Sequence, residues 1–119
     1  YDVIIDDLYA EQEGVPVRCV PMDVEWCEAL AGLLRPGGML IFNMIEPDKV
    51  RHLPIFKSPA LRERFSETIQ YRIDGYENRI VAFSEQAFDP ACLDQQLERI
   101  YKQYPACRGG RSRYIVEVL

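Results

Sequence analysis

The chain has 119 residues, of which 48% are hydrophobic and 28% charged, and its formal net charge is −5. This length allows one domain with a modest core, in a composition ordinary for a globular protein. The acidic balance argues against nucleic acid as a partner, because no basic patch is available to neutralise phosphates. No apolar run reaches the ~20 residues that span a bilayer, so no membrane partner is expected.

The cysteines give no sign of a metal site. They stand at positions 19, 27, 92 and 107, form no CxxC pair, and are accompanied by a single histidine, His52. That leaves no zinc-ligand spacing. We interpret the cysteines as free thiols in a reducing compartment, and the predicted location is cytoplasmic.

The chain opens on an apolar run, Tyr1–Asp6, which predicts a strand buried on both faces, as in a parallel sheet. The run ends in two adjacent carboxylates, Asp6 and Asp7. Acids at the carboxyl end of a strand lie where open α/β sheets bind their ligands. Because the chain starts on this strand with no lead-in, we expect the back half of a larger sheet.

A second apolar strand is predicted after a helix. Residues 10–22 contain one glycine and two prolines and are predicted to form a loop. Asp23 is a plausible cap for a helix whose apolar residues recur at helical spacing. A Gly37-Gly38 turn then leads into the run Met39–Ile45, which is apolar except for Asn43.

The next segment predicts a hairpin. Residues 46–57 read as irregular or short helix, and Ser58-Pro59 is a good helix start. Residues 68–74 alternate with period two, residues 75–78 form a tight turn, and residues 79–84 return as the second strand.

The carboxyl-terminal part predicts a helix and a short strand. Asp89-Pro90 starts the helix and Pro105 ends it; Arg108–Arg111 reads as a basic turn, and Tyr114–Leu119 as a strand. The whole order predicts an α/β fold, in which a parallel sheet is finished by an antiparallel hairpin.

A parallel sheet that ends in a hairpin reversing one strand resembles the back half of a class I S-adenosylmethionine-dependent methyltransferase fold, which is Rossmann-like. The residues make the resemblance narrower: YDVIIDDLY, EGVP, LLRPGGMLIFN and GYENRIVAF are similar to the spermidine synthase family. They resemble most its broad spermidine synthase-like branch, whose fourth strand ends in D-L-Y or D-L-F. The resemblance covers about residues 1–85 and leaves 86–119 as a helix and strand extension.

The resemblance implies a catalytic acid. In aminopropyltransferase members the fourth strand ends in D-S-S-D, where the first acid helps to deprotonate the attacking amine and the second holds the diamine. The first acid falls on Asp7, and the second falls on Ala10, which cannot bind an amine. The family's polar residue after the fifth strand falls on Asn43, and a substrate-facing tyrosine near the hairpin falls on Tyr76.

Two further residues complete the candidate substrate site. Side chains alternate along a strand, so Asp6 should point away from Asp7, and a role in capping the loop weighs against contact with substrate. Tyr9 lies in the loop that would cover the substrate. For Asp7 itself, the structural alternative is a carboxylate that accepts hydrogen bonds from the following loop.

The resemblance also implies a cofactor, S-adenosylmethionine or its decarboxylated form, and a small amine or similar molecule as acceptor. The family's glycine-rich cofactor loop and ribose-binding acid have no counterpart in this sequence. We therefore expect a cofactor in the intact parent, none in this chain, and a transferase fragment that is inactive alone.

Two other functions stay open. A non-catalytic interaction domain that keeps the fold is favoured slightly by Ala10. A receiver-like signalling module is suggested by DVIIDD, which is similar to a phosphoacceptor strand, but the M-P-x-M-D-G run and the later Lys-Pro are missing.

One edge of the first strand is expected to pair with a further strand. In the family's sheet order Tyr1–Asp6 lies between Met39–Ile45 and a strand that this chain lacks, so one of its edges has unpaired backbone groups. We expect that edge to be covered either by Tyr114–Leu119 of the same chain or by a second copy, as a homodimer.

Overall fold

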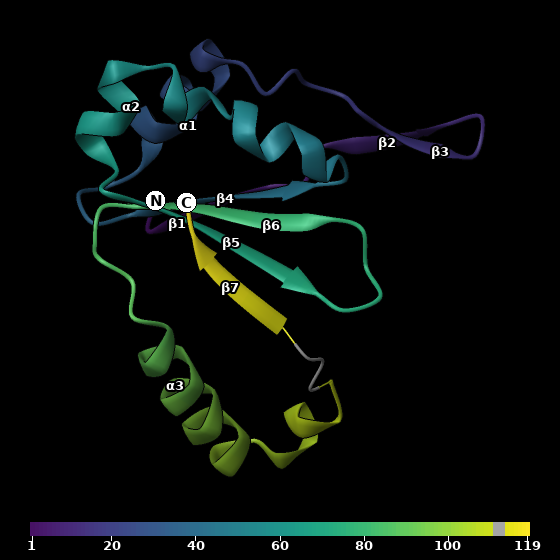
Figure 1. The fold of residues 1–119 in the computed structure, drawn as a ribbon, viewed down its shortest axis with the longest axis vertical. Coiled ribbons are helices and arrows are strands. Elements are labelled where there is room, and N and C mark those ends of the chain that lie inside the picture. The colour runs from purple at the N-terminus through teal and green to yellow at the C-terminus, as the bar shows by residue number, and fades with distance from the viewer. Residues whose placement is uncertain (111–113) are drawn as a thin grey trace.

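The computed structural model describes residues 1–110 and 114–119, without the side chains of 108–110 (Figure 1). The predicted basic turn at 108–111 thus lies in part outside the described residues. Within them the fold is mixed α/β, with a five-stranded sheet, a separate two-stranded hairpin and helices on both sides of the sheet.

The five-stranded sheet has the order β1-β4-β6-β5-β7. Its strands are β1 (Val3–Asp6), β4 (Met39–Met44), β6 (Arg79–Ser84), β5 (Glu67–Ile73) and β7 (Tyr114–Val118). Only β1 and β4 pair in parallel, and the other neighbours are antiparallel. The predicted parallel sheet is thus limited to one pair, because β6 lies between β4 and β5 and separates two strands that run the same way.

The first strand is covered on one face only. Ile4 packs partly against the core and Asp6 is buried, whereas Val3 and Ile5 are 49% and 68% exposed. Among the described residues β1 pairs with β4 alone, so its other edge is free. The prediction of a strand buried on both faces is therefore wrong for this chain, since no layer packs over Val3 and Ile5.

The last strand does not cover that free edge. β7 pairs with β5 at the opposite side of the sheet, where Gln70 Nε2 donates to a Glu117 carboxylate oxygen at 2.8 Å. Pairing of Tyr114–Leu119 with the first strand is thus a wrong prediction, because α3 and the turn after it return the chain to β5. The homodimer stays a prediction.

One face of the sheet carries the helices α1 (Val24–Leu33) and α2 (Pro59–Arg64) and the 3₁₀ turns η1 (Pro47–His52) and η2 (Pro54–Phe56) (Figure 1). The predicted start of each α-helix is confirmed. Asp23 accepts a hydrogen bond from the Trp26 N–H, and Ser58 accepts one from the Leu61 N–H.

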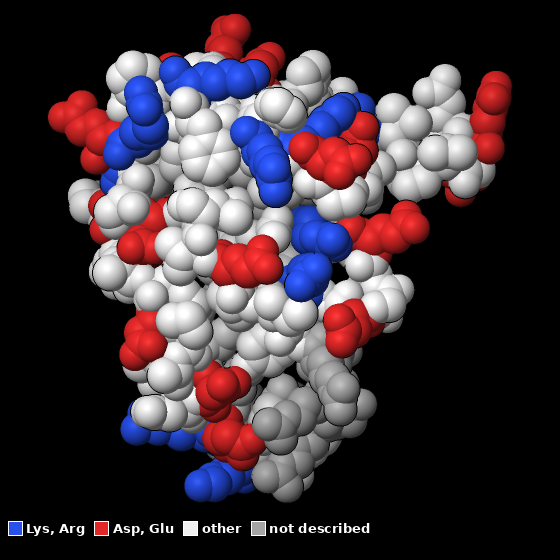
Figure 2. Space-filling view, in the orientation of Figure 1, with Lys and Arg blue, Asp and Glu red and all other residues white. Residues whose placement is uncertain are grey.

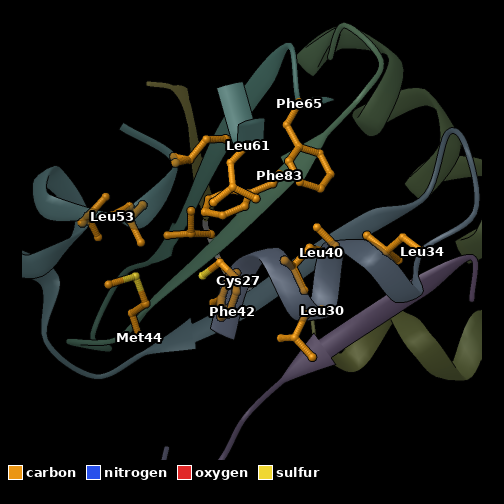
Figure 3. Packing of buried hydrophobic residues seen from close by; sticks show 14 residues of the cluster. Cys27, Leu30, Leu34, Leu40, Phe42, Met44, Leu53, Leu61, Phe65 and Phe83 are labelled. Atoms are coloured by element: carbon orange, nitrogen blue, oxygen red, sulfur yellow. The ribbon is translucent and has the colours of Figure 1, made fainter. Parts of the chain in front are cut away.

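The hydrophobic core fills the space between these helices and the sheet (Figure 3). Phe42 and Phe83 from the strands meet with ring centroids 5.4 Å apart, and Phe65 stands 5.8 Å from Phe83. Cys27 from α1 and Leu53 from the segment between η1 and η2 complete this layer and are almost fully buried. Met44 extends it to the carboxyl end of β4.

A second, small sheet replaces the loop predicted for residues 10–22. β2 (Tyr9–Gln12) and β3 (Val15–Arg18) form an antiparallel hairpin that projects from the body of the protein (Figure 1). Its turn uses Glu13 at φ 54° and Gly14 at φ 79°, and two consecutive positive φ values are what a tight hairpin turn requires. The register places Arg18 opposite Tyr9.

On the other face of the sheet lies α3 (Pro90–Gln103), and the 3₁₀ turn η3 (Pro105–Gly110) packs against α3 (Figure 1). Asp89 caps α3 as predicted, by accepting a hydrogen bond from the Ala91 N–H. No residue of α3 is fully buried. Leu93 and Leu97 instead line an open apolar groove of about 350 Å³ with residues of β5, β6 and β7.

Candidate functional site

The two adjacent acids after the first strand have opposite surroundings. Asp6 is 3% exposed and faces the helical layer, whereas Asp7 is exposed at the carboxyl end of β1. The difference follows from the alternation of side chains along a strand. Each acid therefore belongs to its own group of contacts.

Asp7 lies beside Asn43. The Asn43 Nδ2 donates to Asp7 Oδ1 at 3.0 Å, and the Asn78 Nδ2 donates to Asn43 Oδ1 at 2.8 Å. The parallel pairing of β1 with β4 places Asp6 opposite Phe42, which brings the next residues of the two strands to the same rim. The three side chains form a polar rim, by which we mean Asp7, Asn43 and Asn78.

Tyr9 is a structural neighbour of this rim. Its hydroxyl donates to the Asn43 carbonyl oxygen at 2.8 Å and accepts from the Ile45 N–H at 3.4 Å. These two bonds fasten the start of β2 to the end of β4. The hydroxyl is thus engaged with backbone, and the ring remains as the surface that Tyr9 can offer to a ligand.

Tyr76 lies in the turn between β5 and β6 and is 65% exposed. Its backbone N–H donates to the Ile73 carbonyl at 3.1 Å. The same turn carries Asn78, which contacts Asn43 and which sequence reasoning missed. No local pattern could have identified Asn78, because it reaches Asn43 only through the pairing of β6 with β4.

Asp6 anchors the hairpin to the body of the protein. The Arg18 Nη2 donates to both carboxylate oxygens of Asp6 at 2.7 Å, and the Trp26 indole Nε1 donates to Oδ2 at 2.7 Å. Burial alone would lower the pKa of Arg18, but hydrogen bonds and charge interactions with Asp6, and to a smaller extent with Tyr9, outweigh it, so that pKa is raised. Asp6 therefore holds β1, β3 and α1 together, which supports the structural interpretation over contact with substrate.

Arg18 is the most informative residue that the sequence did not single out. Its side chain is 14% exposed, and its Nε and Nη1 are buried without a hydrogen-bond partner among the described residues. A buried donor left unpaired costs about 1–3 kcal/mol. The available signal was the alternation Val15, Pro16, Val17, Arg18 directly after a glycine, which is typical of the second strand of a hairpin.

Arg18 forms part of a pocket of about 360 Å³, which we call the hairpin pocket. Its apolar lining comes from Met22, Met44, Leu53 and Pro54, and its polar lining from Arg18, Glu46, Lys49 and His52, with the Tyr9 ring between them. Glu46 and Lys49 form an ion pair at 2.8 Å. His52, interpreted from the sequence as a surface residue, is exposed and contributes to the lining.

The described residues contain no group of three or more His, Cys, Asp or Glu side chains that could hold a metal ion. Gly37 and Gly38 lie in the turn that enters β4, at the opposite end of that strand from the polar rim. This turn is therefore too far along the strand to place backbone N–H groups against a cofactor bound at the rim.

Charges of both signs are interspersed over the face of the molecule shown in Figure 2. In the part of the chain that the structure describes, none of the helices has the length and apolar character needed to cross a membrane. Comparisons of the chain with family models, curated proteins and solved structures found no match.

Proposed function

We propose that this chain is the carboxyl-terminal half of a spermidine synthase-like transferase, in which Asp7 accepts a proton from the nucleophile. The observation that carries the proposal is the polar rim: a solvent-accessible carboxylate at the end of one strand, held by an amide from the parallel neighbour. Acids at that edge of an open α/β sheet stand where ligands bind.

The strand arrangement supports the same proposal. Along β1-β4-β6-β5, only β6 runs against the others, which matches a sheet closed by a hairpin that reverses one strand. The free edge of β1 and the exposed Val3 and Ile5 beside it favour a larger sheet in the parent. The four free cysteines favour a reducing, cytoplasmic location.

The proposed chemistry needs one base and a fixed geometry. The cofactor, S-adenosylmethionine or its decarboxylated form, would supply a carbon made electrophilic by a sulfonium. The nucleophile would displace the sulfur from that carbon, and the sulfur would leave with the bonding electrons as a neutral thioether. Asp7 would take the proton that the nucleophile releases, and Asn43 fixes the orientation of the carboxylate.

The acceptor is an amine or a similar small molecule, but the polyamine-binding acid is missing. Ala10 stands where the resemblance requires that acid, on the exposed strand β2 of the hairpin. A methyl group offers no counter-charge to a second ammonium. The site therefore favours an acceptor with a single nucleophilic group over a diamine.

The test of this proposal uses the longer protein encoded by the same open reading frame. Upstream of Tyr1 we expect a glycine-rich turn between a strand and a helix. In that protein Asp7→Asn should lower kcat about 10²–10⁴-fold with cofactor affinity unchanged, and the exposed Asp48→Asn serves as the matched control. Equal turnover in the Asp7 variant and the unaltered enzyme would contradict the role of Asp7.

The chain alone gives a second test. Without the glycine-rich turn it should show no micromolar affinity for S-adenosylmethionine or its decarboxylated form in isothermal titration. A dissociation constant in the low micromolar range would contradict the assignment of the cofactor contacts to the other half of the sheet.

A non-catalytic interaction domain is the second candidate, and it is favoured by Ala10, which stands in place of the second acid. Unpaired backbone groups flanked by the exposed Val3 and Ile5 form a template for another strand. In this case the chain should form a homodimer through β1. Light scattering together with slow amide exchange at residues 3–5 would support it, and a monomer with fast exchange at these amides would exclude it.

A further inference from the structure

We propose that Asn78 is a positioning residue of the transfer reaction, because it holds Asn43 in the orientation in which Asn43 donates to the Asp7 carboxylate. The inference rests on the proposed function for the role of Asp7, and it adds a residue from a distant part of the chain. Asn78 lies in the turn between β5 and β6 and reaches the polar rim because β6 pairs with β4.

The direction of the two hydrogen bonds in the polar rim follows from the chemistry of the three side chains. An ionised carboxylate only accepts hydrogen bonds, whereas an asparagine side chain donates from its nitrogen and accepts at its oxygen. Asn43 therefore turns Nδ2 toward Asp7, at 3.0 Å, and leaves its Oδ1 facing Asn78. Asn78 in turn presents its nitrogen, which donates to that oxygen at 2.8 Å. The three side chains form a directed chain of donors that ends at Asp7.

The side-chain amide of Asn43 is the movable link in this chain. The backbone around it is held, because β4 is paired on both sides and the Tyr9 hydroxyl bonds to the Asn43 carbonyl and the Ile45 N–H. Rotation of the amide by half a turn would exchange its oxygen and nitrogen without moving the backbone. The oxygen would then face the Asp7 carboxylate and the nitrogen would face the nitrogen of Asn78. Both neighbours therefore favour the orientation that serves Asp7.

The arrangement gives the two oxygens of Asp7 different tasks. Oδ1 accepts from Asn43, whereas Oδ2 has no hydrogen-bond partner among the described residues. A carboxylate held at one oxygen rotates less, so its second oxygen keeps a fixed direction toward the nucleophile. The step that Asn78 assists is therefore the removal of the proton. Loss of this assistance should lower kcat rather than the affinity for substrate.

Asn78→Asp tests the direction of the hydrogen bonds with almost no change in shape. The introduced carboxylate only accepts, so it and Asp7 compete for the single nitrogen of Asn43. The contact at position 78 is partly buried, whereas the contact at Asp7 is exposed to water. An unpaired carboxylate costs more where water is excluded, so we expect the nitrogen of Asn43 to turn toward position 78.

Two further variants separate direction from bulk. Asn78→Ala removes the donor without adding a competitor, so Asn43 should keep its nitrogen toward Asp7. The double variant Asp7→Asn with Asn78→Asp exchanges the two groups and restores both hydrogen bonds in the opposite direction. Glu77→Gln is the control, because Glu77 is an exposed neighbour in the same turn and its side chain has no partner among the described residues.

NMR of the chain alone measures the orientation of Asn43. The sequence contains two asparagines, Asn43 and Asn78, so ¹⁵N-asparagine labelling gives two side-chain amide groups. In the unaltered chain and in Asn78→Ala, we expect a nuclear Overhauser effect from the Asn43 Nδ2 protons to the β protons of Asp7. In Asn78→Asp this effect should be replaced by one to the β protons at position 78. The double variant should keep the latter and add one from the amide introduced at position 7 to the β protons of Asn43.

Turnover is measured in the longer protein encoded by the same open reading frame. Asn78→Asp should lower kcat about 10–100-fold without raising the KM of the acceptor, because Asp7 loses its fixed direction. Asn78→Ala should lower kcat only about threefold, since Asn43 still donates to Asp7. The double variant should stay inactive, because position 7 no longer carries a base. Glu77→Gln should change neither kcat nor the spectrum.

Two results would overturn the proposal. One is an Asn43 amide that keeps its contact with Asp7 in Asn78→Asp, and the other is an equal loss of kcat in Asn78→Ala and Asn78→Asp. Full turnover in Asp7→Asn would instead overturn the proposed function, and with it the part of Asn78 in the reaction, while the spectra decide the orientation of Asn43 independently. If Asn78→Asp does not fold, recovery of the fold in the double variant supports the directed chain, and no recovery contradicts it.

Discussion

The two faces of the central sheet differ in how completely they are covered. On the helix-covered face, Leu40, Phe42 and Phe83 have no exposed surface, and side chains from α1 and α2 pack over them (Figure 3). On the other face Val3 and Ile5 are open to solvent, and α3 has no buried residue. The first face therefore carries the main hydrophobic core. On the second, Ile69 and Ala82 are buried, but the surface near β1 remains open to a ligand or partner.

The two acids at the end of β1 give the sharpest way to test this difference. Asp6→Asn removes the charge that balances the buried Arg18, and we expect a loss of about 3–5 kcal/mol in the free energy of unfolding. Asp7→Asn changes an exposed carboxylate on the other side and should stay within about 0.5 kcal/mol. Urea denaturation of both variants measures the contrast, and equal losses would contradict it.

Leucine truncation compares the two layers directly. Leu40→Ala empties a fully buried position in β4 and should cost about 2–5 kcal/mol. Leu97→Ala makes the same change on α3, where the side chain is only partly buried in an open groove, and should cost about 1 kcal/mol or less. A loss from Leu97→Ala as large as that from Leu40→Ala would show that α3 belongs to the core.

Thiol chemistry tests the covered face without a mutation. Burial, assisted by the charge of Asp6, raises the pKa of the Cys27 thiol to about 12, whereas Cys19, Cys92 and Cys107 are exposed. In native protein an alkylating reagent should modify three thiols quickly and Cys27 only after unfolding, as mass spectrometry would show. Modification of Cys27 as fast as the others would mean that α1 opens readily.

The same thiol predicts a pH dependence. The folded-state pKa of Cys27 lies above the value of about 8.5 expected for an unfolded chain. Its contribution to stability is therefore full below that value and is lost as the pH rises toward the folded-state pKa. Cys27→Ser should remove this alkaline component from a series of urea midpoints, and Cys92→Ser should leave it in place.

The smallest effect on stability is expected on the open face. Ile5 is 68% exposed, so Ile5→Lys should change the free energy of unfolding by no more than about 0.5 kcal/mol. A charge beside the free edge of β1 should still prevent pairing with another strand. If the unaltered chain is dimeric, light scattering should show a monomer for this variant. A dimer that persists would locate the interface elsewhere.

The elements that the sequence predicted well are those with local signals. Asp23 and Ser58 mark helix starts because each caps a backbone N–H three residues later. The β5–β6 hairpin is signalled by period-two alternation on either side of a tight turn. By contrast, Pro16 masked the first hairpin, because proline argues against a strand except at an exposed edge, which is where β3 lies.

The strand order of the sheet and the contacts between distant side chains could not be predicted from local patterns, because both depend on which strands become neighbours. Nothing near Arg79 in the sequence says that β6 inserts between β4 and β5, and nothing near Arg18 identifies Asp6 as its partner. The rim was anticipated in part, since Asp7 follows the first strand and Asn43 lies near the end of β4, and these two strands were expected to be parallel neighbours. Asn78 joins them only through the insertion of β6.

The position of β4 inside the sheet has a consequence for how fast the protein folds. β4 pairs with β1 far back in the chain and with β6 far ahead of it, whereas β5 and β6 are joined by a short turn. Distant pairings require the closure of long loops before they gain any contact, so they slow folding. We expect the β5–β6 hairpin to form early, and the closing of the sheet around β4 to be the step that sets the rate.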